Sequence, residues 1–176
     1  MKARAKPSAA VISRDGKYRY KLTRCWSPGG GRAVWIMLNP STADAVQDDA
    51  TIRRCISFAK RWGCGGIEVY NLFALRSRHP TGIEIVDDPV GPDNDRWLSA
   101  AARTTGTVVA AWGGCSTPLQ LRRANEVIEF LLRDRHFSLS TLGITKSGQP
   151  RHPLYARNDA PLSPLVHPVE FRRGHR

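Results

Sequence analysis

A run of five apolar residues, Val34 to Leu38, constrains the fold more than any other stretch of this chain. Such a run is too short for a typical helix, so it predicts a strand buried on both faces, as in a parallel sheet. The run stops at Asn39-Pro40, because proline cannot continue a backbone ladder and favours an extended residue before it. We therefore expect Asn39 at the carboxyl end of a central strand, the edge where open α/β sheets bind ligands. A plain turn is the alternative, since Asn, Pro and Ser are common turn residues.

The composition is that of a globular domain with a large excess of positive charge. The chain has 176 residues, 41% of them hydrophobic, which predicts a single domain spanning residues 1–176. Its 27 Lys and Arg against 15 Asp and Glu give a formal net charge of +12. This excess favours an anionic partner, with nucleic acid as the first candidate.

The cysteine and hydropathy patterns argue against several other classes of protein. The four cysteines include no CxxC pair and have no matching pair of histidines, so we expect no metal site, no cofactor and no disulfide framework. Reduced cysteines fit the cytoplasm. No apolar run approaches the length of a membrane span, and no apolar segment follows the basic tail 1–7, so we expect neither a membrane partner nor a secretion signal.

Before the central run, the pattern predicts a β-hairpin. Residues 9–12 and 17–26 flank Asp15-Gly16, which is a strong signal for a type I′ turn. In the second arm, apolar residues alternate with basic or polar ones, which predicts one apolar and one basic face. The apolar set is Tyr18, Tyr20 and Leu22, and the other set is Lys17, Arg19, Lys21 and Thr23.

After the central run, helical and strand patterns alternate. Apolar residues recur at helical spacing from about Thr51 to Trp62, with Asp48 or Asp49 as the N-cap. The other expected elements are a strand at 67–73, a helix at 93–104, a strand at 107–112, a helix at 119–135, a strand at 137–142, a long loop at 143–155 and an irregular basic segment at 157–176. This alternation predicts an α/β fold, a three-layer α/β/α sandwich with a mainly parallel central sheet and the hairpin at its edge.

Distinctive side chains follow the expected strand ends, which meet at one edge of such a sheet. The groups are Asn39-Pro40-Ser41, Asn71-Leu72-Phe73, Trp112-Gly113-Gly114 and Arg151-His152-Pro153. The amide of Asn39 can orient a water molecule, and that of Asn71 can read the imide or amide edge of a base. His152 can stabilise developing negative charge, and Phe73 or Trp112 can stack on a base. The structural alternatives are a strand-end hydrogen bond for Asn71, core packing for Trp112 and a loop hydrogen bond for His152.

These motifs resemble a bacterial and phage family, the domain-of-unknown-function family 1643. The resemblance covers nearly the whole chain and is specific, but membership by itself implies no activity. It is carried by Leu-Asn-Pro-Ser-Thr-Ala-Asp at 38–44, Asn-Leu-Phe-Ala-Leu at 71–75, Ala-Trp-Gly at 111–113 and Thr-Lys-Ser-Gly-Gln-Pro-Arg-His-Pro-Leu-Tyr at 145–155.

In order and context, the motifs are also similar to those of the uracil-DNA glycosylase superfamily. This more distant resemblance implies that Asn39, followed by Pro40, positions or activates the hydrolytic water. It further implies that Asn71 reads the pyrimidine edge and that His152 steadies charge on the departing base. The segment 109–113 resembles the Leu-Trp-Gly strand of that superfamily.

The sequence departs from that superfamily at three places. Met37-Leu38 replaces the glycines or glutamine expected before the first motif. Ser41 stands where a tyrosine excludes a thymine methyl group, which is consistent with a roomier pocket for a modified base. For the element that inserts into the duplex, the chain offers Leu154-Tyr155 or the segment 163–165.

Three functions agree with these features. The first is a DNA glycosylase-like hydrolase that flips out a base and cleaves its N-glycosidic bond. The second is a nucleic-acid-binding module of the same fold without catalysis, and the third is an enzyme acting on free nucleosides or nucleotides. For the first function, Asn39 and His152 are the expected catalytic residues, and either Asp44 or Asp49 can supply a carboxylate. The expected substrate-binding residues are Pro40, Ser41, Asp44, Asp49, Asn71, Phe73 and Trp112. The residues expected to contact double- or single-stranded DNA are Arg76, Arg78, Lys146, Arg151 and Tyr155.

Overall fold

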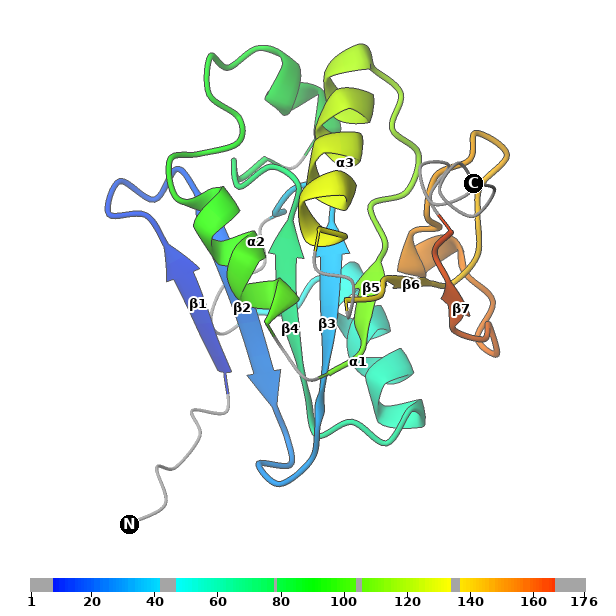
Figure 1. The fold of residues 1–176 in the computed structure, drawn as a ribbon. Helices are drawn as coiled ribbons and strands as arrows, with labels where there is room; N and C mark the ends of the chain where they lie inside the picture. Colours follow the sequence, from blue (N-terminus) through cyan, green and yellow to red (C-terminus); the bar gives the residue numbers. More distant parts are fainter. Residues whose placement is uncertain (1–7, 42–46, 78, 104–105, 134–136, 167–176) are drawn as a thin grey trace.

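The apolar run forms β3 (Arg32–Met37), which lies inside a mixed sheet. The computed structural model describes residues 8–41, 47–77, 79–103, 106–133 and 137–166. Within these residues, seven strands form one sheet of order β1-β2-β4-β3-β5-β6-β7 (Figure 1). β3 is parallel to β4 (Gly66–Asn71) on one side and to β5 (Val108–Ala110) on the other. The predicted buried central strand is therefore confirmed.

Antiparallel strands extend both edges of this parallel centre. β1 (Ser8–Ile12) and β2 (Arg19–Cys25) form the predicted hairpin, and β2 pairs antiparallel with β4. On the other side, β6 (Ser140–Thr141) is parallel to β5, and β7 (Ser163–Pro164) is antiparallel to β6. The expected α/β fold with a hairpin at the sheet edge is confirmed.

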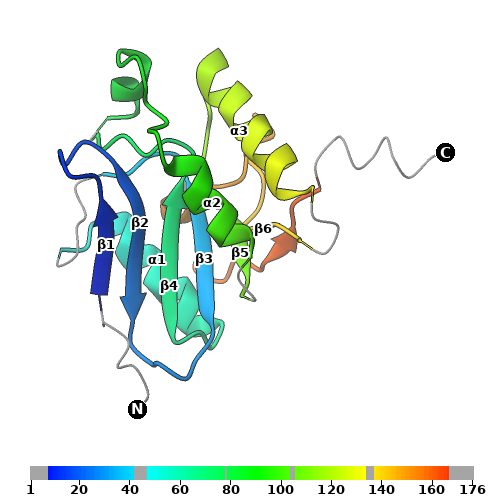
Figure 2. The ribbon, with the colours of Figure 1, turned by 60° about the vertical axis from the view of Figure 1, so that its left-hand side comes forward.

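Helices cover both faces of the sheet. α1 (Ala50–Arg61) packs on one face, and α2 (Asn94–Ala102) and α3 (Pro118–Leu131) pack on the other (Figures 1 and 2). β3 contributes side chains to the cores on both faces of the sheet, because successive side chains point to opposite faces. The α1 face receives Ala33, Trp35 and Met37, and the opposite face receives Val34 and Ile36. Asp49 caps α1, as predicted, by accepting the Ile52 N–H at 2.8 Å.

The connections place a topological switch point at the centre of the sheet. From β3 the chain crosses through α1 to β4 on one side, and it then returns through α2 to β5 on the other side. The connections that follow the carboxyl ends of β3 and β5 therefore lead to opposite faces of the sheet. Open α/β folds bind ligands at such a point. The segments 38–41 and 111–116 follow these two strand ends.

The hairpin turn differs from the prediction. A type I′ turn requires positive φ at both central residues, but within the described residues only glycines have positive φ, and Gly16 is one of them at 74°. The connection is longer instead. Ser13 N donates to Tyr18 O, and Gly16 N donates to Ser13 O, both at 2.9 Å. Asp15 accepts the Lys17 N–H at 3.0 Å, which stabilises this wider loop.

The expected alternation of β2 is also wrong, because the strand contains a β-bulge. Val11 pairs with Lys21, whereas Ile12 pairs with Arg19, so Tyr20 is an extra residue in the ladder. The bulge moves Arg19 off the basic face, and its residue exposure is only 2%.

The later elements are shorter than their sequence patterns suggest. The strands expected at 107–112 and 137–142 are Val108–Ala110 and Ser140–Thr141. After β5 the chain leaves the sheet, since Gly113 N donates to Pro150 O at 2.9 Å rather than to a strand. The third helix starts at Pro118 with Thr117 as its N-cap, a Thr-Pro start that the sequence does contain. The short 3₁₀ helices η1 (Pro80–Glu84) and η2 (Pro153–Tyr155) complete the fold.

In the part of the chain that the structure describes, each helix is too short or too polar to cross a bilayer.

Candidate active site at the strand ends

A cavity of about 360 Å³ lies at the carboxyl ends of the central strands. Its walls come from the ends of β3 and β4, the segment after β5, the start of α1 and the loop around η2. Of the residues predicted from sequence, it brings together Asn39, Ser41, Asp49, Asn71, Trp112, His152 and Tyr155. The prediction that these strand ends share one site is therefore consistent with the geometry.

The amide of Asn39 is held in one orientation. Its Nδ2 donates to Ser77 O at 3.1 Å and to Pro40 O at 3.3 Å. Because both partners are acceptors, the amide nitrogen must face them, and the position of Oδ1 follows. Among the described residues, no group donates to Oδ1. Asn39 lines the cavity with its amide nitrogen fixed, so its Oδ1 is left to accept a hydrogen bond, for example from a water molecule.

Asn71 ends β4 with a buried amide that lacks a partner. The residue is 1% exposed, and its Nδ2 has no hydrogen-bond partner within the residues that the structure describes. A buried donor without an acceptor costs about 1–3 kcal/mol, so such groups are rare in native structures. Since Asn71 lines the cavity, a bound ligand is the natural source of the missing acceptor.

The backbone around Asn71 is clamped from the opposite face of the sheet. The buried Asn94 of α2 donates from Nδ2 to Asn71 O at 3.0 Å and to Leu72 O at 2.9 Å. Arg123 of α3 donates from Nε to Leu72 O at 2.9 Å, and its guanidinium forms a salt bridge with Asp95. The end of β4 is thus rigidly placed, while the side chain of Asn71 stays available.

Asp49 and Ser41 join the first motif to the start of α1. Asp49 Oδ1 accepts the Ile52 N–H at 2.8 Å, and Ser41 Oγ donates to Asp49 Oδ2. Both carboxylate oxygens are therefore used to cap the helix and to hold the segment that follows Asn39. This arrangement gives Asp49 a positioning role in the structure.

His152 lines the cavity, and its surroundings favour the neutral form of its ring. Burial lowers the pKa of His152 below its ordinary value, and the Asp49 carboxylate acts in the opposite direction. His152 Nδ1 accepts the Leu154 N–H at 3.3 Å, and with this bond a neutral ring carries its proton on Nε2. Gly113, at φ +80°, packs against it, and a Cβ there would lie 3.1 Å from His152 Cβ. Only glycine fits this close approach without a shift.

The loop that carries His152 is tied to α1. Arg54 donates from Nε to Pro153 O at 3.2 Å and from Nη2 to Ala156 O at 2.8 Å. The sequence pattern suggests only a solvated role for Arg54, because its partners lie about a hundred residues away along the chain. Next to His152, with ring centroids 5.8 Å apart, Tyr155 is 77% exposed and lines the cavity. Tyr155 is therefore an aromatic ring with an open face beside the site.

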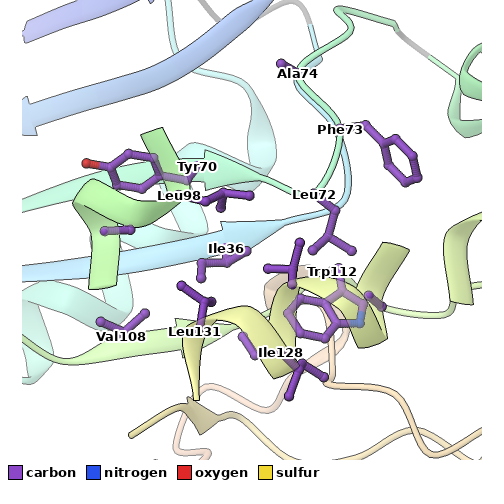
Figure 3. Packing of buried hydrophobic residues seen from close by; sticks show 14 of the residues in the cluster. Ile36, Tyr70, Leu72, Phe73, Ala74, Leu98, Val108, Trp112, Ile128 and Leu131 are labelled. Carbon is purple, nitrogen blue, oxygen red and sulfur yellow. The ribbon is translucent and has the colours of Figure 1, made fainter. Parts of the chain in front are cut away.

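The two aromatic residues expected to stack on a base are both buried. Phe73 and Trp112 belong to the core cluster on the α2 and α3 side of the sheet (Figure 3). Phe73 is 0% exposed and does not line the cavity, because β4 ends at Asn71 and Phe73 N donates to Leu38 O at 2.9 Å. Trp112 contributes to the cavity wall, but its Nε1 donates to Gln149 Oε1 at 3.0 Å. Pro40 is buried and receives the bond from Asn39.

The basic residues expected at the nucleic-acid surface fall into different settings. Arg76 donates from Nη1 to Gly16 O at 3.1 Å and so braces the hairpin loop. Lys146 is exposed, and Arg151 donates from Nη2 to Ile144 O at 3.0 Å. A second cavity, of about 470 Å³, is lined by Arg151 and Arg157 and shares Tyr155 with the first. Asp44 and Arg78 lie outside the described residues.

Sequence reasoning missed several residues of the cavity wall, and Arg19 is the one among them with a charged side chain. The alternation along β2 assigns it to a solvated face, and no sequence signal marks the bulge that reverses its direction. Within the described ranges, no group of three or more His, Cys, Asp or Glu side chains is placed to hold a metal ion.

Comparison with known proteins identifies the family of the chain. A family model described as "Protein of unknown function (DUF1643)" matches residues 19–154, and the chain belongs to this family. The matched range contains the residues that line the first cavity from Arg19 to His152. Tyr155, which also lines it, lies directly after the range. Searches of curated proteins and of solved structures found no match.

Proposed function

We propose that this member of the DUF1643 family is a DNA glycosylase-type hydrolase, with the three-layer arrangement of the uracil-DNA glycosylase superfamily. It takes a flipped base into the cavity and cleaves the N-glycosidic bond. The observation that carries this proposal is the buried amide of Asn71, which lines the cavity with its Nδ2 unpartnered among the described residues. An amide offers donors and an acceptor together, which matches the edge of a nucleobase.

Asn39 has the chemistry to position the attacking water. Its amide nitrogen is fixed by two backbone carbonyls, so its Oδ1 can accept a hydrogen bond from water without reorganising. In the hydrolysis, the water oxygen bonds to C1′ of the sugar as the C1′–N bond breaks. The bonding electron pair leaves with the base, and a proton from the water balances the charge of the products.

His152 has the chemistry to stabilise the departing base. Negative charge develops on the base as the glycosidic bond breaks, and a fixed donor close to that charge lowers the barrier. The neutral ring, with Nδ1 occupied by the Leu154 N–H, offers Nε2–H as that donor. The bond from Leu154 and the close contact with Gly113 restrict how the ring can turn.

The size and charge of the site support a nucleic-acid substrate. A cavity of about 360 Å³ is at the lower end of small-molecule sites and has room for one nucleoside, so a base must leave the stack to enter it. The exposed Tyr155 ring can stack on a base beside the cavity. The net charge of +12, together with Lys146 and Arg151, favours the phosphate backbone as the partner outside the cavity.

A cleavage screen tests this function. Labelled oligonucleotides carrying uracil, hypoxanthine, mismatches or modified pyrimidines are incubated with the protein, and abasic sites are detected by alkaline breakage. Asn39→Ala and His152→Ala are compared with Asn158→Ala and His79→Ala, which change the same residue types at exposed positions outside the cavity. Breakage at one base, lost in the first pair and kept in the second, supports the glycosylase. No breakage, with salt-sensitive binding by all five proteins, supports the binding module instead.

A further inference from the structure

Arg19 brings a buried positive charge to the cavity. It is 2% exposed, yet it lines the same cavity as Asn39, Asn71 and His152. Arginine stays protonated in proteins, and transferring its charge out of water is costly. A buried guanidinium in a cavity wall is therefore a specific feature of the site.

The bulge at Tyr20 is what places Arg19 there. Leu22 packs on the α1 face of the sheet, and strict alternation from Leu22 would put Arg19 on the other face. Lys21 does point to that other face, since its Nζ forms a salt bridge with Glu68 at 2.8 Å and lies 5.5 Å from the ring centre of Tyr70. The extra residue reverses the face of the sheet to which the side chains before it point, so Arg19 lines the cavity. Bulges are common next to active sites, where they redirect a side chain in this way.

The neighbours of Arg19 in the cavity wall make this region rich in donors. Asn71 Nδ2 lacks an acceptor within the described residues. The carboxylate of Asp49 also lines the cavity, but its oxygens accept from Ile52 N and Ser41 Oγ. A guanidinium has five N–H donors, so Arg19 can bind an anion while it keeps other partners. The complementary ligand carries oxygen acceptors with negative charge.

We propose that Arg19 selects a substrate with an anionic oxygen group. Because Arg19 lines the same cavity as Asn71, the proposed reader of the base, this group is assigned to the base itself as a carboxylate-type substituent. This inference rests on the proposed glycosylase function and names its substrate class, a base bearing an acidic substituent. Two sources offer the same chemistry, a substituent on a base within DNA and the phosphate of a free nucleotide. Because Arg19 is buried, either group pairs with its guanidinium more strongly than with one in bulk solvent.

Binding rather than cleavage is the measurement that tests this inference. Short oligonucleotides carry either 5-carboxy-2′-deoxyuridine or its neutral 5-carboxamide at one position, and fluorescence anisotropy gives their dissociation constants. The proteins are wild type, Arg19→Gln, Arg19→Lys and Lys21→Gln. Lys21→Gln is the matched control, because it removes one positive charge from the same strand on the opposite face. Circular dichroism and thermal unfolding check that each variant is folded.

We expect wild type to bind the carboxylate at least about tenfold more tightly than the carboxamide, as one charge-assisted contact provides. Arg19→Gln should bring this ratio close to one, Arg19→Lys should retain part of it, and Lys21→Gln should retain all of it. An equal affinity of wild type for the two oligonucleotides, or an unchanged ratio in a folded Arg19→Gln, would overturn the inference.

A second arm separates the two sources of negative charge. Thermal unfolding is measured with deoxyuridine monophosphate and with the uncharged nucleoside. Stabilisation by the nucleotide alone, lost in Arg19→Gln, would assign Arg19 to a phosphate and overturn its assignment to the base. A preserved carboxylate preference without base release in the cleavage screen would contradict the proposed function and leave the role of Arg19 intact.

Discussion

Replacing Asn71 by leucine should stabilise the protein and abolish its recognition of the base. The native side chain is 1% exposed and has an Nδ2 without an acceptor in the described residues. A buried donor in this state costs about 1–3 kcal/mol, and leucine, of similar size, removes that cost. We therefore expect Asn71→Leu to raise the free energy of unfolding by about 2 kcal/mol. For a chain of this length, that change corresponds to a rise in Tm of about 4–8 °C.

Asn94 offers a matched control for this prediction. It is also a buried asparagine, at the start of α2, and its Oδ1 likewise has no partner in the described residues, but its Nδ2 donates to the carbonyls of Asn71 and Leu72. Asn94→Leu removes both hydrogen bonds, so we expect it to lower the free energy of unfolding by about 1–3 kcal/mol. The two substitutions should therefore shift stability in opposite directions.

Urea denaturation followed by tryptophan fluorescence measures both variants without ligand. A higher midpoint for Asn71→Leu, at an unchanged slope, indicates a gain in stability. If Asn71→Leu instead lowers the midpoint as much as Asn94→Leu does, the amide of Asn71 has structural partners, and its assignment as the base reader loses its basis.

Three further predictions concern the rest of the cavity. Because burial lowers the pKa of His152, the unfolded state binds more protons just below its ordinary pKa of about 6.5. The stability that neutral His152 contributes should thus be present above that pH and lost as the pH falls through the lowered pKa. Urea midpoints measured across pH should show this loss in wild type but not in His152→Gln. Gly113→Ala should lower the free energy of unfolding by about 1–2 kcal/mol because of its positive φ, and its contact with His152 should also abolish base release. Gly148→Ala, at φ +78° with open space around it, should lower stability without affecting base release. Asn39→Asp sets a carboxylate against two carbonyl oxygens, so it should lower Tm relative to wild type at pH 7. At pH 4, when the carboxyl is protonated, the difference in Tm should shrink. A Tm equal to that of wild type at both pH values would show that the amide orientation is unimportant.

The sequence predicts most clearly what depends on local pattern. The apolar run of β3, its stop at Asn39-Pro40 and the Asp49 cap of α1 follow from neighbouring residues, and the structure contains all three. The alternation of strands and helices is enough to bring Asn39, Asn71 and His152 to one edge of the sheet. Proximity at a sheet edge follows from topology, without knowledge of any side-chain contact.

The sequence fails where a contact between distant segments decides the outcome. The bulge at Tyr20 depends on how β2 pairs with β1, and a one-residue change of register reverses every following side chain. β5 ends at Ala110, and beyond it Gly113 bonds to the distant Pro150 instead of to a strand. Phe73 is buried for a similar reason, since its backbone bonds to Leu38 beyond the end of β4. Arg19 and Phe73 are therefore clear examples of residues whose positions only the structure supplies.

The most direct test of the glycosylase account is a mass balance on the oligonucleotide that gives breakage in the screen. Mass spectrometry quantifies the free base and the abasic strand after a single turnover, for wild type and for the Asn39→Ala/His152→Ala double variant. The account predicts free base and abasic strand in equal amounts, with water as the only added atoms, and neither product from the double variant. An intact strand that remains bound, or a base released with its sugar attached, would contradict it.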